Sequence, residues 1–327
     1  MPLTSLPMIQ QEMIRYGMSI YCALGIIGNV CNCIMFTRSN YRHTANSLYL
    51  NFFSISAIIY LIWSTAPHFY SLNYVDAQTQ SLFYCKIRLF VGHSLGQYLR
   101  FCIVLACIDR FLVTRIDVRL RSFHSIAIAK KFLLIMTVVC PLFAIHLPIF
   151  MEIRNNVCSQ FGVYKLAYAT YQFIVVGVVP PVLMIVFSIL TVVSLQHRHN
   201  GQVRAKQRDR HLLKMVIVEV ILNVIVSIPY SINLLYGALT HLTSKNARRL
   251  EIESFITFLT TFSIYLISIT PFYLFVFTSK SFRKNFIALA VSFWYKYILR
   301  QAHVAPVTEH RITPTVHQMP FNSKIKI

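Results

Sequence analysis

Seven long apolar stretches are the feature of this sequence that most constrains its fold. Each has at least the roughly 20 residues that an α-helix needs to cross the hydrocarbon core of a bilayer. The first stretch, Tyr16 to Phe36, contains no Asp, Glu, Lys or Arg. We therefore predict seven membrane-spanning helices, near residues 16–36, 47–70, 87–113, 132–151, 164–195, 212–236 and 252–278.

Composition disfavours other classes of protein. Hydrophobic residues make up 56% of the 327 residues and charged residues only 13%, whereas soluble domains are about half apolar and about a quarter charged. A soluble enzyme is therefore disfavoured. The 25 Phe and 18 Tyr are too many for a disordered chain. We predict an all-α membrane protein, a bundle of seven transmembrane helices.

The distribution of basic residues predicts the orientation of this bundle. Lys and Arg number 21 in the C-terminal tail and the loops predicted on its side of the membrane, and 5 on the other side. Because basic loops stay in the cytoplasm, the N-terminus is predicted outside and the C-terminus inside. The net charge of +21 is thus mainly a topology signal, and we expect membrane lipids, not nucleic acid, as partners.

Beyond the seventh span the chain becomes amphipathic. Phe282, Phe286, Leu289 and Phe293 recur near helical spacing, with Arg and Lys between them, which is typical of a helix in the membrane interface. We expect a short cytoplasmic eighth helix here. The predicted organisation is an extracellular N-terminus, a seven-helix domain, an amphipathic cytoplasmic helix and a disordered cytoplasmic tail, at residues 1–14, 15–278, 279–300 and 301–327.

Two of the eight cysteines differ from the rest in position. Six fall inside the apolar spans, whereas Cys85 begins the third span and Cys158 lies in the second outer loop. An oxidising exterior permits a disulfide between them, and that bond would hold the loop over the mouth of the bundle. The Cys and His spacings do not match a metal site, so we expect no metal and no cofactor.

Short motifs accompany the spans. The third span ends in Asp109-Arg110-Phe111, 25 residues after Cys85. The others are a Gly-Asn pair, prolines in the fifth and sixth spans, and a Thr-Pro pair followed by tyrosine: Gly28-Asn29, Pro180-Pro181, Pro229, Thr270-Pro271 and Tyr273. Together with seven spans, an outer N-terminus and the cysteine pair, these motifs resemble those of the rhodopsin-like (class A) G-protein-coupled receptors.

The sequence departs from that family's pattern in several places. Phe111 replaces the tyrosine of the Asp-Arg-Tyr motif, the tryptophan expected before Pro229 is absent, and Thr270 stands where the family has asparagine. The divergent pattern looks most like invertebrate orphan receptors of the FMRFamide-type neuropeptide and chemosensory kinds. The resemblance implies a plasma-membrane receptor with an extracellular ligand and a heterotrimeric G protein as partners.

Arg110 is the residue expected to carry the signalling switch. The resemblance implies that Asp109 and an acid on a neighbouring helix hold its guanidinium. Asp209 lies 20 residues before Pro229, which is about 30 Å along the sixth helix and near the depth of Arg110. We predict an Arg110–Asp209 ion pair that ties the third helix to the sixth. The alternative is that both side chains reach toward lipid headgroups.

Prolines and charges inside the spans have predictable consequences. Pro229 removes a backbone hydrogen bond and kinks the sixth helix, and the resemblance implies that this helix swings outward on activation. Pro180-Pro181 is expected to distort the fifth helix. Charges within a span need partners, so we predict that Arg100 bonds to Glu219 or Asn223. The alternative is that each of them lines a watery cavity.

The outer half of the bundle is the predicted ligand site. Gly92 lies 18 residues before Arg110, where amine receptors carry an aspartate, so an amine ligand is disfavoured. The neutral-to-basic lining suits a carboxylate, while acids in the outer loops suit a basic peptide, and we favour a neuropeptide over a small chemosensory molecule. The candidate pocket residues are Arg88, His93, Gln97 and His68.

Two other functions compete with the receptor. The chain has no catalytic or nucleotide-binding motif, so we expect no enzyme. A seven-span channel or transporter without G-protein coupling is the main alternative. The internal repeats that are common in transporters are missing from the sequence, and seven-span chemosensory channels would invert the predicted orientation.

Overall fold

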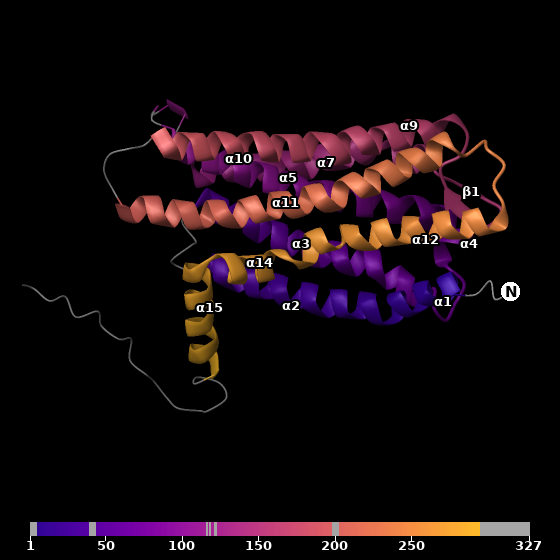
Figure 1. Cartoon of the computed structure of the whole chain (residues 1–327), viewed down its shortest axis with the longest axis horizontal. Coiled ribbons are helices and arrows are strands. Elements are labelled where there is room, and N and C mark those ends of the chain that lie inside the picture. The colour runs from indigo at the N-terminus through magenta and orange to yellow at the C-terminus, as the bar shows by residue number, and fades with distance from the viewer. Residues whose placement is uncertain are drawn as a thin grey trace, which may run out of the picture. The chain divides into compact units, whose positions relative to one another are not determined.

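The computed structural model describes residues 5–38, 44–115, 117, 119–120, 123–197 and 203–294, without the side chains at 5, 197, 203–213, 215 and 293. Within this part, seven helices are long and apolar enough to cross a membrane. They run alongside one another (Figure 1) and belong to one compact unit that ends at Phe286. The predicted seven-helix bundle is confirmed.

The helices follow the predicted order, and several of them are segmented. The first three spans are α1 (Ser5–Glu12), η1 (Met13–Gly17) and α2 (Met18–Thr37); α3 (Ala45–Tyr70); and, after the short α4 (Ala77–Gln80), α5 (Leu82–Thr114). The fourth, fifth and sixth are α7 (Ile126–Ala144) with α8 (His146–Phe150); α9 (Val163–Tyr171), η2 (Gln172–Val178) and α10 (Val179–His197); and α11 (Val203–Leu239). The seventh span and the helix after it are α12 (Ala247–Ile264), α13 (Leu266–Ile269), α14 (Pro271–Thr278) and α15 (Lys280–Phe293).

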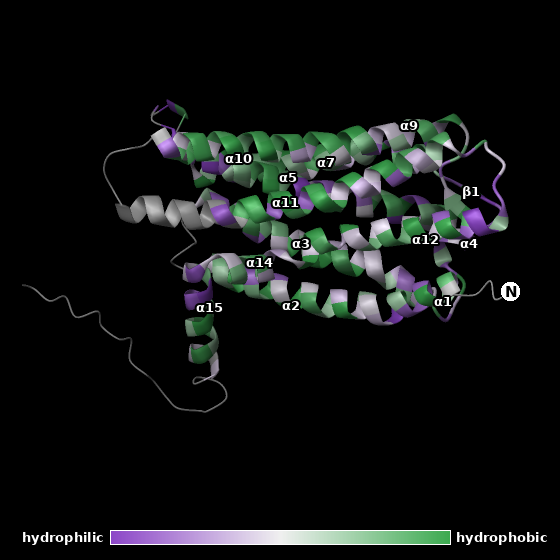
Figure 2. Cartoon of the chain, viewed as in Figure 1, coloured by the Kyte–Doolittle hydropathy of each residue, from purple (hydrophilic) through white to green (hydrophobic). Residues whose placement is uncertain are grey.

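The outward-facing side chains of the helices are largely apolar, unlike those of a water-soluble bundle, and many polar side chains are buried inside. On α11 the exposed face carries isoleucines at positions 221, 225, 228 and 232. The opposite, buried face is polar and consists of Glu219, Asn223, Ser227 and Ser231. Apolar residues, green in Figure 2, recur along the described parts of the long helices and are most continuous on α10. Because lipid favours apolar groups and confines polar ones to the interior, the chain is a multi-pass membrane protein.

Helix α5 is the central helix of the bundle. Of its most apolar 18-residue window, 67% is buried, the largest share among the seven spans. Its side chains Leu99, Ile103 and Ala106 form the main apolar core with residues of α3, α7, α10 and α11. The side chains in the middle of α5 are therefore held between several neighbouring helices.

Prolines mark the irregular parts of the spans. The expected distortion of the fifth helix lies just before Pro180-Pro181, where η2 is a π-helix. Two prolines lack the N–H groups that would bond to the carbonyls of Val176 and Gly177, so the preceding turn widens. Pro271 begins α14 after a break at Thr270, whereas Pro229 lies inside an α11 that is helical on both sides of it.

A short hairpin forms the second outer loop. Strands β1 (Glu152–Arg154) and β2 (Val157–Ser159) pair in antiparallel register, with Ile153 opposite Cys158. The two turn residues, Asn155 and Asn156, have φ values of 51° and 57°. Two-residue hairpin turns with both φ angles positive match the twist of the strands, and asparagine tolerates this conformation.

Candidate functional site

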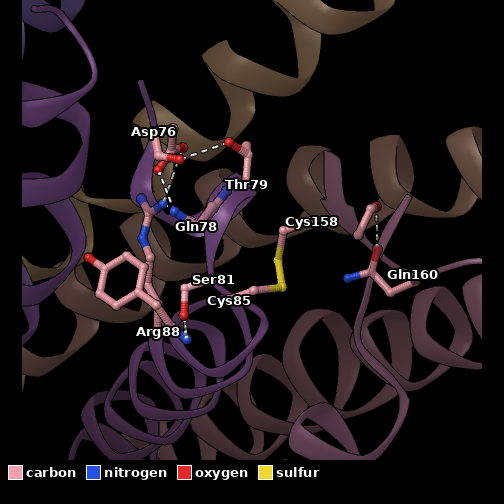
Figure 3. The surroundings of a disulfide bond; sticks show 10 residues. Asp76, Gln78, Thr79, Ser81, Cys85, Arg88, Cys158 and Gln160 are labelled. Atoms are coloured by element: carbon pink, nitrogen blue, oxygen red, sulfur yellow. Dashed lines mark hydrogen bonds and ion pairs between the residues drawn. A yellow bond between two sulfur atoms is a disulfide. The ribbon is translucent and has the colours of Figure 1, made fainter. Parts of the chain in front are cut away.

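The hairpin is joined to α5 by a disulfide. Cys85, in the first turn of α5, bonds to Cys158 in β2, with Cα atoms 6.0 Å apart, so the predicted disulfide is confirmed. Cys85 is fully buried beside Leu147 and Met151. The bond fixes the hairpin at this end of the bundle (Figure 3), which we call the disulfide end.

A cavity of about 300 Å³ lies at the disulfide end, between α3, α5, α11 and the fifth and seventh spans. Three of the four predicted pocket residues, Arg88, His93 and His68, line it. Gln97 is fully buried and lies outside the lining that the structure describes. Sequence reasoning missed the aromatic walls, because hydropathy does not give the rotation of one helix against another: Tyr60, Trp63, Tyr168, Tyr230 and Tyr265.

Arg88 lies at the mouth of this cavity. Its guanidinium donates to the Gln78 side chain and lies 3.8 Å from the Asp76 carboxylate and 3.5 Å from His68 Nε2. Figure 3 shows Arg88 pointing toward Asp76 and Gln78. The indole of Trp63 donates to the Arg88 carbonyl at 3.0 Å. The charge of Arg88 is therefore shared with an acid of the protein itself.

A polar chain lines the wall between α5 and the fifth span. His93 Nε2 lies 2.9 Å from the Tyr171 hydroxyl. Gln172, at the start of η2, donates to the Tyr168 hydroxyl at 2.7 Å. The His93–Tyr171 contact joins α5 to the fifth span beside the cavity, and the Gln172–Tyr168 bond lies within the fifth span.

Arg100 forms the floor of the cavity, and its hydrogen-bond partner differs from the predicted one. Its Nη1 donates to the Gly96 carbonyl of its own helix at 2.9 Å, whereas the side-chain polar atoms of Glu219 and Asn223 have no hydrogen-bond partner among the described residues. The expected bond from Arg100 to either residue is not formed. Arg100 reaches the cavity with Tyr230, and Glu219 lies 11 residues before Tyr230, about 16 Å away along α11.

The opposite end of α5 carries a buried charge cluster. Arg110 Nη2 lies 2.7 Å from Asp109 Oδ2, and His124, in the loop before α7, contacts the other Asp109 oxygen. Sequence reasoning missed His124, because nothing in a loop pattern marks a partner 15 residues away. The Phe111 ring lies 5.7 Å from that of Phe187 on α10. The side chain of Asp209 is outside the described residues, so the Arg110–Asp209 pair stays a prediction.

Motif residues of the first and seventh spans contact each other. Asn29 Nδ2 donates to the carbonyls of Gly25, at 2.8 Å, and Ser268, at 2.7 Å. The Tyr273 hydroxyl donates to the Leu24 carbonyl at 2.9 Å. The sequence placed these residues in different spans, and the structure brings them to one interface between α2 and the α13–α14 segment.

A comparison with known protein families gives the same class of protein as the seven-helix fold. Residues 28–273 match the family described as 7 transmembrane receptor (rhodopsin family), and this match covers more than half of the chain. The chain therefore belongs to the rhodopsin family of seven-transmembrane receptors, whose members bind extracellular ligands, signal through G proteins and are not enzymes. No individual curated protein matches it significantly.

Proposed function

We propose that the chain is a plasma-membrane receptor that binds an extracellular ligand at the disulfide end and activates a heterotrimeric G protein at the Arg110 end. The observation that carries the proposal is the arrangement along α5. Arg100 lines the cavity, and Arg110 lies ten residues further along the same helix, about 15 Å away. One rigid, central helix thus connects a ligand-sized cavity to a charged end.

Helix α11 supplies the moving part of this proposal. It lines the cavity with Tyr230, next to Pro229, and extends from there toward the residues near Arg110. Its buried Glu219, Asn223 and Ser227 side chains have no hydrogen-bond partner among the described residues, so few bonds oppose its movement. A ligand that prefers one position of Tyr230 shifts the population of α11 positions.

The size of the outer pockets favours a peptide over a small chemosensory molecule. A second pocket of about 780 Å³ lies between the hairpin, α9, α11 and α12, and Tyr168 lines both it and the deeper cavity. A ligand that fills both is longer than a single small molecule of ordinary size. A neuropeptide that places one end in the cavity and the rest against the hairpin fits this arrangement.

The structure weakens the case for a basic peptide. Three acids at the outer end already have basic partners in the chain. Glu253 lies 2.5 Å from Lys245 and 2.9 Å from Arg249, and the other pairs are Asp76 with Arg88 and Glu152 with Arg154. A basic ligand would have to displace these partners.

The proposal is tested in intact cells. The receptor, with an N-terminal tag, is co-expressed with a promiscuous G protein and exposed to pooled neuropeptides. We expect surface labelling without permeabilisation and a response that Arg110→Ala reduces. Labelling only after permeabilisation contradicts the orientation. A response that is the same in Arg110→Ala contradicts the role of the charged end.

A further inference from the structure

Arg100 is a buried cation at the floor of the cavity without an anion beside it. The residue is 6% exposed, and its Nε has no hydrogen-bond partner in the described part of the chain. No described carboxylate pairs with it: the ion pairs nearest in the sequence are those of Arg88 with Asp76 and of Arg110 with Asp109. A buried charge that lacks a counter-ion is costly, and ionisable groups at membrane depth are typically functional.

Two glycines leave the approach to Arg100 open. Gly92, Gly96 and Arg100 follow one another at four-residue spacing, on one face of α5, and all three line the cavity. A Cβ on Gly96 would lie 3.5 Å from Arg100 Nη1, and a Cβ on Gly92 would lie 3.8 Å from Trp63. Side chains of ordinary size at these positions would occupy the space above the guanidinium.

The charges on the walls favour an anion. Arg88, His68 and His93 line the cavity together with Arg100. Asp76 is the one acid among the lining residues described, and Arg88 lies 3.8 Å from it. Counting the arginines and the aspartate alone, the lining has a net positive charge, and the unshared part of that charge is at Arg100.

We propose that Arg100 binds a carboxylate of the ligand at the floor of the cavity. A guanidinium offers paired N–H donors that match a carboxylate. The aromatic side chains of Tyr60, Trp63 and Tyr230 surround the space above it and suit an apolar or aromatic ligand body. The carboxylate comes from a small organic acid or from the free C-terminus of a peptide. This inference rests on the proposed receptor function and specifies the chemistry of its ligand.

The binding test uses Trp63 as a reporter. The chain has two tryptophans, Trp63 and Trp294, so Trp294→Phe leaves the cavity residue as the only indole. The purified receptor in lipid nanodiscs is titrated with matched pairs of probes: 3-phenylpropionate and 3-phenylpropionamide, and the tripeptide Gly-Gly-Phe as free acid and as amide. Fluorescence of Trp63 and the melting temperature are recorded for each.

We expect at least one free acid to shift both signals and its amide to bind more weakly. Arg100→Gln should weaken binding of the acid about 10- to 100-fold, which is the effect of losing a hydrogen bond to a charged group. The affinity for the amide should stay unchanged. Arg15→Gln, which changes an exposed arginine at the disulfide end outside both pockets, is the control for overall charge and should bind the acid normally. Response to the tripeptide acid alone identifies a peptide source, and response to phenylpropionate identifies a small acid.

Two results overturn the proposal: acids and amides that bind alike or not at all, or acid binding that persists unchanged in Arg100→Gln. Gly92→Leu keeps Arg100 but fills the space above its guanidinium, so it should also abolish acid binding. This variant provides the test if Arg100→Gln does not fold. None of these readouts uses a G protein. Failure of the receptor function in cells therefore remains distinguishable from failure of carboxylate binding.

Discussion

Single buried polar residues fall into two groups in this bundle. Asn29 and Asp109 each contact two partners, one close by in the sequence and one on another segment, which is Ser268 for Asn29 and His124 for Asp109. Glu219 and Asn223 have no hydrogen-bond partner among the described residues. A buried polar group with partners stabilises its surroundings, whereas one without partners costs free energy. The first group therefore stabilises the described arrangement, and we expect substitutions in the second group to cost less.

Asn29 tests this distinction for stability. Asn29→Ala removes its bonds to the Gly25 and Ser268 carbonyls, and we expect the free energy of unfolding to fall by about 1–3 kcal/mol. Asn223→Ala is the matched control. It should lower the free energy of unfolding by less, because no described hydrogen bond is lost. Thermal unfolding of the purified variants measures both. Equal losses would contradict the assignment of Asn29 as the bond between the first and seventh spans.

Asp109 and Asp209 test the restraint on Arg110. Asp109→Asn removes the charge that contacts both Arg110 and His124, so basal G-protein activation should rise. Asp209→Asn should also raise it, if the predicted ion pair with Arg110 forms. The measurement is basal nucleotide exchange at equal surface expression. Unchanged basal exchange in Asp209→Asn rejects that pair, while Asp109→Asn tests the described contact separately.

Among the helices, α11 is the one that the proposed function assigns as the moving part. It contains Pro229 within a helix of 37 residues. Pro229→Ala adds the missing N–H donor, and the straighter helix should be more stable, by up to about 3 kcal/mol. We expect the melting temperature to rise and receptor-stimulated exchange to fall.

Pro67, inside α3, gives the matched control for Pro229. Pro67→Ala should leave exchange nearly unchanged, because α3 has no assigned movement. If both proline variants reduce exchange equally, the effect belongs to general rigidity of the bundle. That outcome would contradict a specific lever in α11.

The hairpin is an element that depends on its disulfide. Cys85 and Cys158 are 73 residues apart, and closing a loop of that length stabilises a protein by about 4 kcal/mol in the chain-entropy model. Replacing both cysteines with serine should lower the melting temperature. Dithiothreitol should lower that of the wild type and leave the variant unaffected. A wild type that is insensitive to reductant would contradict a stabilising role.

At the scale of the whole molecule, the seven spans were predictable because lipid leaves few choices to the backbone. A chain that crosses a bilayer must satisfy its hydrogen bonds within helices about 20 residues long. The helix starts were less accurate, since hydropathy ignores caps. The Ser81 side chain accepts a bond from the Tyr84 backbone N–H and starts α5 at Leu82, five residues before the predicted limit. Most of the predicted N-terminal segment is likewise helical, from Ser5.

The candidate site was predictable only in part. Residue type and depth placed Arg88, His93 and His68 near the cavity, and the cysteine pattern gave the disulfide. Sequence spacing alone did not reveal that Arg100 points along its own helix to Gly96, because the direction of a long side chain depends on which neighbours leave room for it. The glycines at positions 92 and 96 are the sequence feature from which the direction of the Arg100 side chain could have been predicted.

The most direct test of the whole account is guanine-nucleotide exchange by purified receptor in nanodiscs, with one Gα protein at a time and its βγ partner. We predict that the wild type accelerates exchange on at least one Gα, and that Arg110→Ala abolishes this acceleration. Arg15→Ala, which changes an exposed arginine at the disulfide end, should leave it intact. If no Gα responds to the folded wild type, or if Arg110→Ala remains fully active, the chain does not signal in the way proposed.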